Sequence, residues 1–371
     1  MNMAEPEPKI RLASPSSSVA SLPAIRDILQ SGRLTQGVYR EKFERALCEY
    51  FQVSYAVTTN SGTSALLAML RGLGVGPGHK VALPDYGFAA TAGAVEVLGA
   101  MPIFLDVNND NFSIPQNSLD WAATKKPDFV IAVHQFGLPC DFASLQRWAK
   151  EINAVLAEDS ACALGTMTDG EPLGCSGLAA ILSFHPRKIV TTGEGGAVLT
   201  NDEKLAEFVR AYGEHGFSVS DKRLLFPGMN YRLPEISSAV GLEQMERIES
   251  IIAARVRVGA KYRERLRPHD AYFLPQASPD TIWNHQTFFI ALTGGAKRAK
   301  IIAAMRQAGI ECNVPARSIS SLDYYKKQCA VSDEQVPNSR RWDKCAIGLP
   351  CHEFLSEDDI EKVCVALLEN L

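Results

Sequence analysis

Six short apolar runs, separated by amphipathic stretches, dominate the first half of this 371-residue chain. The runs are residues 55–59, 81–83, 102–105, 129–133, 154–157 and 179–184. Between most of them, segments such as 64–73 and 142–152 carry apolar side chains at helical spacing. Strands buried on both faces read as continuous apolar runs, and their alternation with helices is typical of a mainly parallel sheet. We therefore predict an α/β fold whose ligands bind outside the carboxyl ends of the strands.

The flanking segments divide the chain into three predicted parts. Residues 1–18, rich in Pro and Ser, predict an N-terminal arm that docks on the body. Residues 19–240, which begin with helical patterns over 22–29 and 39–51, would form the large domain.

Residues 241–371 would form a long connecting helix and a small C-terminal α+β domain. The helical pattern runs over residues 234–266. Beyond it we expect a strand at 286–292, a helix at 296–308, and a helix at 357–368 with Ser356 as its N-cap.

Composition excludes several classes of protein. The net charge is -4, and no basic stripe with interleaved aromatic residues points to nucleic acid. The nine cysteines include no C-x-x-C pair, which disfavours structural disulfides and zinc and favours a reducing cytoplasm. No stretch has the length of a membrane span, and the N-terminus lacks the pattern of a signal peptide.

The first polar strand end is residues 60–64, where a strand stops and a helix begins. Gly62 allows close approach of a ligand to the backbone, and Ser61, Thr63 and Ser64 add hydroxyls. Free amides at a helix N-terminus bind anions, so this turn suits a phosphate group. The same residues also fit an ordinary helix cap.

The second polar strand end is Glu158-Asp159, directly after residues 154–157. A carboxylate here can ligate a metal, contact a ribose, or pair with a protonated ring nitrogen. No His or Cys stands at ligand spacing, and no G-x-G-x-x-G turn follows the first strand, so the ring-nitrogen interpretation remains.

The third strand end carries Lys188, which follows residues 179–184 and precedes a glycine-rich turn at 193–196. A lysine amine that is desolvated in a crevice can be partly neutral and attack a carbonyl. Ser183 would give the phosphate another hydroxyl. A phosphate site, a carboxylate and a lysine in this order are the minimum set for pyridoxal 5'-phosphate. Tyr86 or Phe88 could stack on its ring, and for Tyr86 we prefer core packing.

Together these motifs resemble one family over nearly the whole chain, from about residue 10 to the C-terminus. The matching segments are 34–37, 42–44, 61–66, Pro84 with 88–91, His134 with 137–139 and Asp141, 158–159, 183–186 with Lys188, 192–196 and 228–236. The chain is similar to the sugar aminotransferases of the DegT/DnrJ/EryC1/StrS group, which have the fold-type I architecture of aspartate aminotransferase.

The resemblance implies a role for each matching residue. Lys188 would hold the cofactor as a Schiff base and move the proton between substrate and cofactor. Asp159 would pair with the pyridine nitrogen, and Phe88 would stack on the ring. The phosphate would be held by Gly62, Thr63 and Ser183. The position of Asn230 reaches the phosphate from the neighbouring subunit in this family, which implies a homodimer with shared active sites.

Two positions depart from the family pattern. Cys162 stands where the family usually has Gln or His near the phenolic oxygen of the cofactor, and a thiol is a weaker donor. We expect Cys162 to tune or enlarge the site without abolishing turnover. Arg187 adds a charge beside the lysine, which would either meet an anionic substrate group or face solvent.

The resemblance implies an aminotransferase that moves an amino group from L-glutamate to a keto-sugar linked to a nucleotide. A non-nucleotide ketone, such as a free keto-sugar, a sugar acid or a keto-cyclitol, is the alternative acceptor. Lys188 argues against the dehydratase branch of the family, where histidine replaces the lysine. A silent cofactor-binding regulator would not need the complete set of site residues, and an oxidoreductase would need the missing dinucleotide fingerprint.

Overall fold

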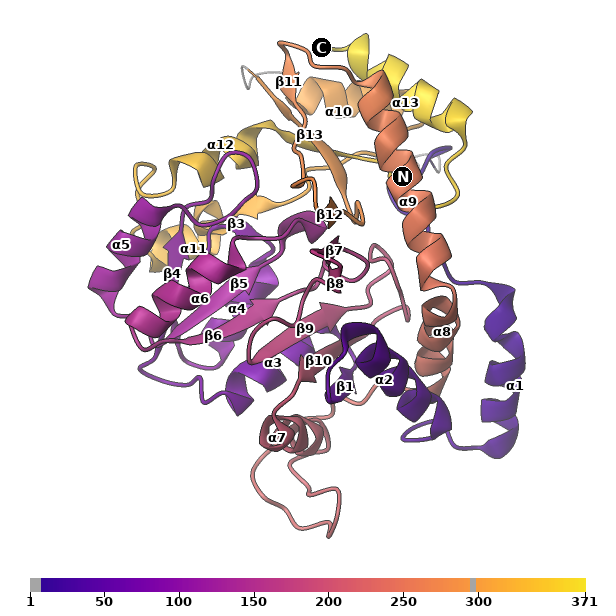
Figure 1. The fold of residues 1–371 in the computed structure, drawn as a ribbon, viewed down its shortest axis with the longest axis vertical. Helices are drawn as coiled ribbons and strands as arrows, with labels where there is room; N and C mark the ends of the chain where they lie inside the picture. Colours follow the sequence, from indigo (N-terminus) through magenta and orange to yellow (C-terminus); the bar gives the residue numbers. More distant parts are fainter. Residues whose placement is uncertain (1–7, 294–297) are drawn as a thin grey trace, which may run out of the picture.

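The centre of the molecule is a seven-stranded sheet (Figure 1). The computed structural model describes residues 8–293 and 298–371. The strands are β1 (Tyr55–Thr59), β2 (Lys80–Pro84), β4 (Met101–Leu105), β5 (Phe129–Val133), β6 (Val155–Asp159), β9 (Ala179–Ser183) and β10 (Gly196–Thr200), in the order β1-β10-β9-β6-β5-β2-β4. Only β10 runs against its neighbours within this sheet, and all other adjacent pairs are parallel. The predicted α/β class is confirmed.

Helices cover both faces of the sheet because successive strand residues point to opposite sides. Val81 and Leu83 pack with α3 (Gly62–Gly72), α4 (Ala89–Val97) and α7 (Glu203–Gly213). Ala82, between them, packs with α5 (Gln116–Lys125) and α6 (Phe142–Glu151). Farther along this second face, α2 (Val38–Phe51) and α8 (Glu235–Glu246) cover β9 and β10.

A smaller α+β unit follows, as the sequence predicted. Its antiparallel sheet has the order β11 (Tyr272–Phe273), β13 (Phe288–Leu292), β15 (Ala346–Leu349), and packs with α9 (Ile248–Arg265), α10 (Arg298–Gln307) and α13 (Glu357–Leu368). Ser356 caps α13 in a reciprocal capping box with Asp359. The predicted start of α10 at residues 296–297 lies outside the described residues.

The predicted continuous helix over 234–266 is divided in two. Arg247 has φ -123° and ψ 22°, which ends α8 and starts α9 in a new direction. The side chain of Arg247 bonds Glu243 Oε1 at 2.7 Å and also contacts the carbonyl of Ser16. The sequence pattern did not reveal this break, because no Pro or Gly marks the boundary.

The described part of the predicted arm lies along the C-terminal unit. Ile10 pairs with Ile310, and the Leu12 carbonyl accepts from Cys351 N–H at 3.1 Å. Residues 1–7 of the arm lie outside the described part. After the arm come η1 (Val19–Ser21) and α1 (Leu22–Ser31), and α1 packs beside α8 at the edge of the molecule (Figure 1). The boundaries near residues 18 and 240, which separate the arm, the large domain and the C-terminal part, remain a prediction.

The remaining elements are short. They are β3 (Tyr86–Gly87), η2 (Gln135–Gly137), β7 (Met167–Thr168), β8 (Glu171–Pro172), β12 (Thr281–Ile282), β14 (Arg317–Ser318), η3 (Ile319–Ser321), α11 (Asp323–Gln328) and α12 (Pro337–Cys345). β3 pairs with β14 and so ties the segment after β2 to the C-terminal unit. Within residues 8–293 and 298–371, no helix has the length and apolar character needed to cross a bilayer.

Candidate active site

The three polar strand ends predicted from the sequence meet at one edge of the large sheet. β1 and β9 both run antiparallel to β10, and β9, β6, β5 and β2 are parallel to one another. The carboxyl ends of all these strands therefore lie on the same side, where ligands bind in such sheets.

The turn between β1 and α3 forms a cradle for an anion. Ser61 caps the helix, with its Oγ accepting from Ser64 N–H at 3.0 Å, so the amides of Gly62 and Thr63 start the helix without intrahelical partners. A Cβ on Gly62 would lie 2.8 Å from Ser183 Cβ, and one on Gly196 would lie 2.7 Å from the Gly62 nitrogen. The structure thus brings Gly62 and Ser183 together. They lie so close that only glycine fits at position 62.

Asp159 ends β6 with both carboxylate oxygens held. Thr91 Oγ1, from α4, donates to Asp159 Oδ2 at 2.6 Å, and Ala161 N–H donates to Oδ1 at 3.2 Å. Asp159 and Thr91 are both buried. A carboxylate fixed by two donors can present its charge in one direction to a cationic ring.

The side chain of the neighbouring Glu158 lies on the opposite face of the sheet, where both of its oxygens have hydrogen-bond partners. Its Oε2 lies 2.9 Å from His134 Nε2, and its Oε1 accepts from Gly177 N–H at 2.6 Å. His134 Nδ1 accepts from Cys140 N–H at 3.3 Å, so the Nε2–H tautomer donates to Glu158. This buried pair joins β5 to β6 and leaves Asp159 as the carboxylate available to a ligand.

Sequence reasoning did not identify Thr91 as a site residue, because its contact to Asp159 spans 68 residues of chain. We expect Thr91→Val to lower kcat/KM about tenfold or more, since a hydrogen bond to a charged group contributes about 1.5–3 kcal/mol. Cofactor affinity, measured by absorbance titration, should fall as well. Thr91→Ser keeps the hydroxyl and should restore both values; equal losses in the two variants would contradict this role.

Lys188 lies in the turn between β9 and β10. Its N–H donates to the His185 carbonyl at 2.8 Å, and Thr192 N–H closes the turn on the Phe184 carbonyl at 3.0 Å. The half-buried Lys188 Nζ donates to Cys162 Sγ at 3.0 Å. The catalytic candidate and the family-atypical thiol are therefore in direct contact.

His185, in the same turn, is a neutral neighbour of the lysine. Burial lowers the pKa of its imidazole; Glu194 opposes this effect, and the charges of Lys188 and Arg187 add to it. Its Nδ1 accepts from Arg187 N–H at 3.2 Å, as a neutral ring can. The imidazole therefore adds no positive charge beside Lys188 at pH 7.

A segment of the C-terminal unit, Asn284 to Gln286, holds the backbone on both sides of this contact. Asn284 Nδ2 donates to the carbonyls of Cys162 and Leu164, both at 2.8 Å. Gln286 Nε2 donates to the Arg187 carbonyl at 3.0 Å. Sequence patterns did not indicate these residues, because they contact segments that lie far away in the chain.

The two aromatic candidates have opposite environments. Tyr86 is fully buried against Phe112, Phe136 and Trp342, as the preferred interpretation had it. Phe88 is 77% exposed and stands at the N-cap of α4, the helix that carries Thr91. Phe88 is thus free to cover a ring held by Asp159.

Asn230 and Arg187 are both exposed. The Asn230 carbonyl accepts from Asn60 Nδ2 at 3.3 Å, beside the anion cradle of the same chain. The Arg187 backbone is held by Gln286, and its exposed position fits an anionic substrate group or solvent equally. Across residues 8–293 and 298–371, no group of three or more His, Cys, Asp or Glu side chains could hold a metal ion.

Comparison with known proteins agrees with this geometry. The model of the DegT/DnrJ/EryC1/StrS aminotransferase family matches residues 16–368, and the chain belongs to this family.

Three solved structures illustrate the similarity. PseC of Helicobacter pylori, an aminotransferase involved in the biosynthesis of pseudoaminic acid, is 25% identical with a TM-score of 0.92, over 97% of this chain and 98% of that one. The PLP-form of Spr1654, a putative sugar aminotransferase of Streptococcus pneumoniae, is 26% identical with a TM-score of 0.90, over 97% and 99%. DesI, solved in the presence of its TDP-sugar product, is 27% identical with a TM-score of 0.89, over 98% and 92%.

The protein is a pyridoxal 5'-phosphate-dependent aminotransferase of the sugar aminotransferase family. The residues present fit that cofactor: the amides of Gly62 and Thr63 at the start of α3, with Ser183 beside them, suit a phosphate, and the doubly held Asp159 suits a protonated ring nitrogen.

Proposed function

We propose that this enzyme transfers the amino group of L-glutamate to a keto-sugar linked to a nucleotide, most specifically a keto-deoxyhexose, in the biosynthesis of an amino sugar. The observation that carries the proposal is the meeting of Lys188, Asp159 and the Gly62–Ser183 cradle at one sheet edge. The similarity to DesI, which was solved in the presence of its TDP-sugar product, supports a nucleotide-linked acceptor.

Each residue has a distinct task in this proposal. The bound cofactor supplies an electron sink for carbanion chemistry. Lys188 Nζ would bind its aldehyde and, when free, would hold and move the proton at the substrate carbon. Asp159 would keep the pyridine nitrogen protonated, and Phe88 would cover the ring. Gly62, Thr63 and Ser183 would hold the phosphate.

The acceptor assay tests the proposed function. The purified enzyme with L-glutamate should form 2-oxoglutarate when a nucleotide-linked keto-sugar is present, and the sugar product should carry a new amine by mass spectrometry. Turnover of a free keto-sugar, a sugar acid or a keto-cyclitol, with no turnover of nucleotide sugars, would replace the proposed acceptor by the alternative that Cys162 leaves open.

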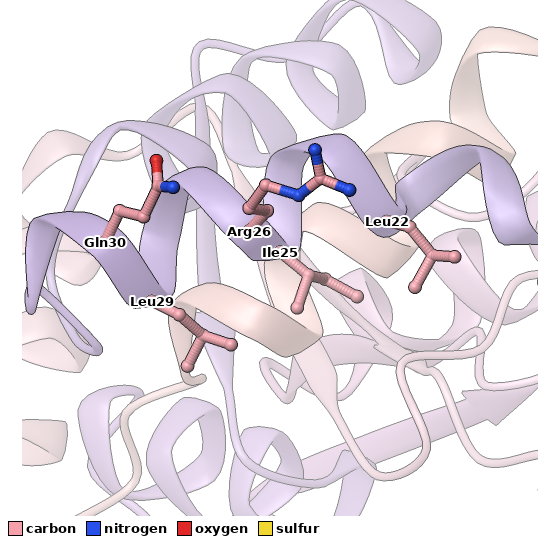
Figure 2. A pocket seen from close by; sticks show the side chains of 5 residues that line it. All are labelled: Leu22, Ile25, Arg26, Leu29 and Gln30. Carbon is pink, nitrogen blue, oxygen red and sulfur yellow. The ribbon is translucent and has the colours of Figure 1, made fainter.

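We further propose that two chains share each active site in a homodimer. Leu22 and Leu29 of α1 are 53% and 59% exposed, and Figure 2 shows Leu22, Ile25 and Leu29 along one side of this helix. The segment before Asn230 also exposes Leu224, Leu225 and Met229. Burial of such side chains against a second copy would be favourable, and would place the Asn230 of each chain near the phosphate of the other.

Mixed dimers test this sharing. Lys188→Ala and Asn230→Ala chains should each have low activity alone. When they are mixed, half of the dimers should contain one chain of each kind, and one of their two sites has both native residues. About one quarter of all sites should then recover. If heterodimers form, as seen with differently tagged chains, and no activity returns, the cross-subunit role of Asn230 is wrong.

All nine cysteines are free thiols. This state is the expected one in a reducing compartment, and we propose the cytoplasm as the location of the enzyme.

A further inference from the structure

We propose that Cys162 and Lys188 form a reversible sulfur–nitrogen bond when peroxide oxidises the thiol, and that this bond switches the enzyme off. The proposal depends on the proposed function only for the statement that the Lys188 amine must be free to take up the cofactor. The bond itself depends on the contact between the two side chains.

The contact is direct. Lys188 Nζ and Cys162 Sγ lie 3.0 Å apart, and the two residues come from turns that follow β9 and β6. Both residues are half-buried, so a small oxidant can reach the sulfur. The thiolate is the form of cysteine that attacks peroxide.

Hydrogen bonds to the backbone hold the two side chains next to each other. Asn284 holds the Cys162 carbonyl, and Gln286 holds the Arg187 carbonyl next to Lys188. The buried Arg255 fixes this segment in turn, with its Nη2 donating to the carbonyls of His285 and Gln286 at 3.0 and 3.1 Å. Because both sides are anchored to one segment, little rearrangement is needed for the bond to form.

Gly137 limits how the Cys162 backbone can move. A Cβ at Gly137 would lie 2.8 Å from the Cys162 carbonyl oxygen, so these two backbones touch. The Cys162 backbone therefore has no room to move toward Gly137.

The chemistry balances in two steps. The Cys162 thiolate attacks hydrogen peroxide, the O–O bond breaks, and sulfenic acid forms; the leaving hydroxide takes a proton from the Lys188 ammonium group and becomes water, which leaves the amine neutral. Sulfur is oxidised and peroxide is reduced. The neutral Lys188 amine then attacks the sulfur, an S–N bond forms, and the S–O bond breaks with release of the oxygen as water. The protein loses two hydrogen atoms in total. An added dithiol can reduce the S–N bond to thiol and amine.

The state of the lysine decides whether the link can form. When the cofactor occupies Nζ, the nitrogen cannot attack sulfur. When the cofactor is absent or carries the amino group itself, the amine is free beside the thiol. Peroxide should therefore produce the sulfur–nitrogen bond only when the cofactor is absent or carries the amino group.

The test is peptide mass spectrometry of the full-length enzyme after hydrogen peroxide treatment, in three samples: with pyridoxal phosphate bound, with the cofactor converted by L-glutamate, and with the cofactor removed. We expect a joined pair of peptides containing Cys162 and Lys188, lighter than their sum by two hydrogens, in the cofactor-free sample and in the sample converted by L-glutamate. The cofactor-bound sample should show little of it, and dithiothreitol should separate the peptides and restore cofactor uptake.

Controls separate this proposal from the proposed function. Cys162→Ser and Cys162→Ala should abolish the link, whereas Cys329→Ser, which removes another half-buried thiol, should leave it intact. Cys162 carrying only added oxygen, or joined to a second cysteine while Lys188 stays free, would overturn the proposal. Failure of the proposed function would show differently, because L-glutamate would then leave the absorbance of the cofactor-bound sample unchanged.

Discussion

Replacement of Lys188 by alanine is expected to remove transamination almost completely. In the proposed function, Lys188 Nζ both binds the cofactor and carries the proton, and a positioned proton carrier alone contributes about 10²–10⁴-fold to rate. The variant should also lose the yellow absorbance of the lysine-bound cofactor. Steady-state kinetics and the visible spectrum measure the two effects on the same sample.

A matched control for this variant is Lys204→Ala, which removes an exposed lysine from the first turn of α7. It should keep both the absorbance and the rate. An Lys188→Ala enzyme with turnover close to that of the parent would contradict the assignment of the catalytic amine.

Replacement of Asp159 by asparagine is expected to lower kcat/KM about 10- to 150-fold at unchanged fold. The side chain keeps its size and its contact with Thr91, but loses the charge that would hold the proton on the ring nitrogen. A hydrogen bond between charged groups contributes about 1.5–3 kcal/mol, and each 1.36 kcal/mol is a factor of ten in rate.

Asp120→Asn, at an exposed position in the middle of α5, is the control for a lost carboxylate and should behave like the parent enzyme. Circular dichroism should show that both variants are folded. A kcat/KM within threefold of the parent for Asp159→Asn would mean that another group protonates the ring.

Much of the fold could be predicted from local pattern. The apolar runs at 55–59 and 129–133 are β1 and β5 to the residue, because strands buried on both faces carry an uninterrupted apolar signal. β10 was not anticipated, since it starts at Gly196 directly after the glycine-rich turn, and its antiparallel direction depends on pairing with β1 and β9. The break at Arg247 was missed for a similar reason: its cause is contact with distant residues.

The candidate site was predictable where one strand end carries its own chemistry. Asp159, Lys188 and Gly62 each stand at such an end, so their meeting follows from the parallel sheet. The positions of the groups that orient these residues do not follow from the sheet. Thr91 reaches Asp159 from another helix, and Asn284 reaches Cys162 across 122 residues, distances over which sequence periodicity carries no information.

The most direct test of the central claim is the near-ultraviolet and visible absorbance spectrum of the purified enzyme, recorded before and after addition of L-glutamate. We predict a yellow band from the cofactor bound to Lys188, which L-glutamate replaces by the absorbance of the pyridoxamine form. A protein that shows no such band even after addition of pyridoxal phosphate would contradict the assignment of Lys188, Asp159 and the Gly62–Ser183 cradle to this cofactor.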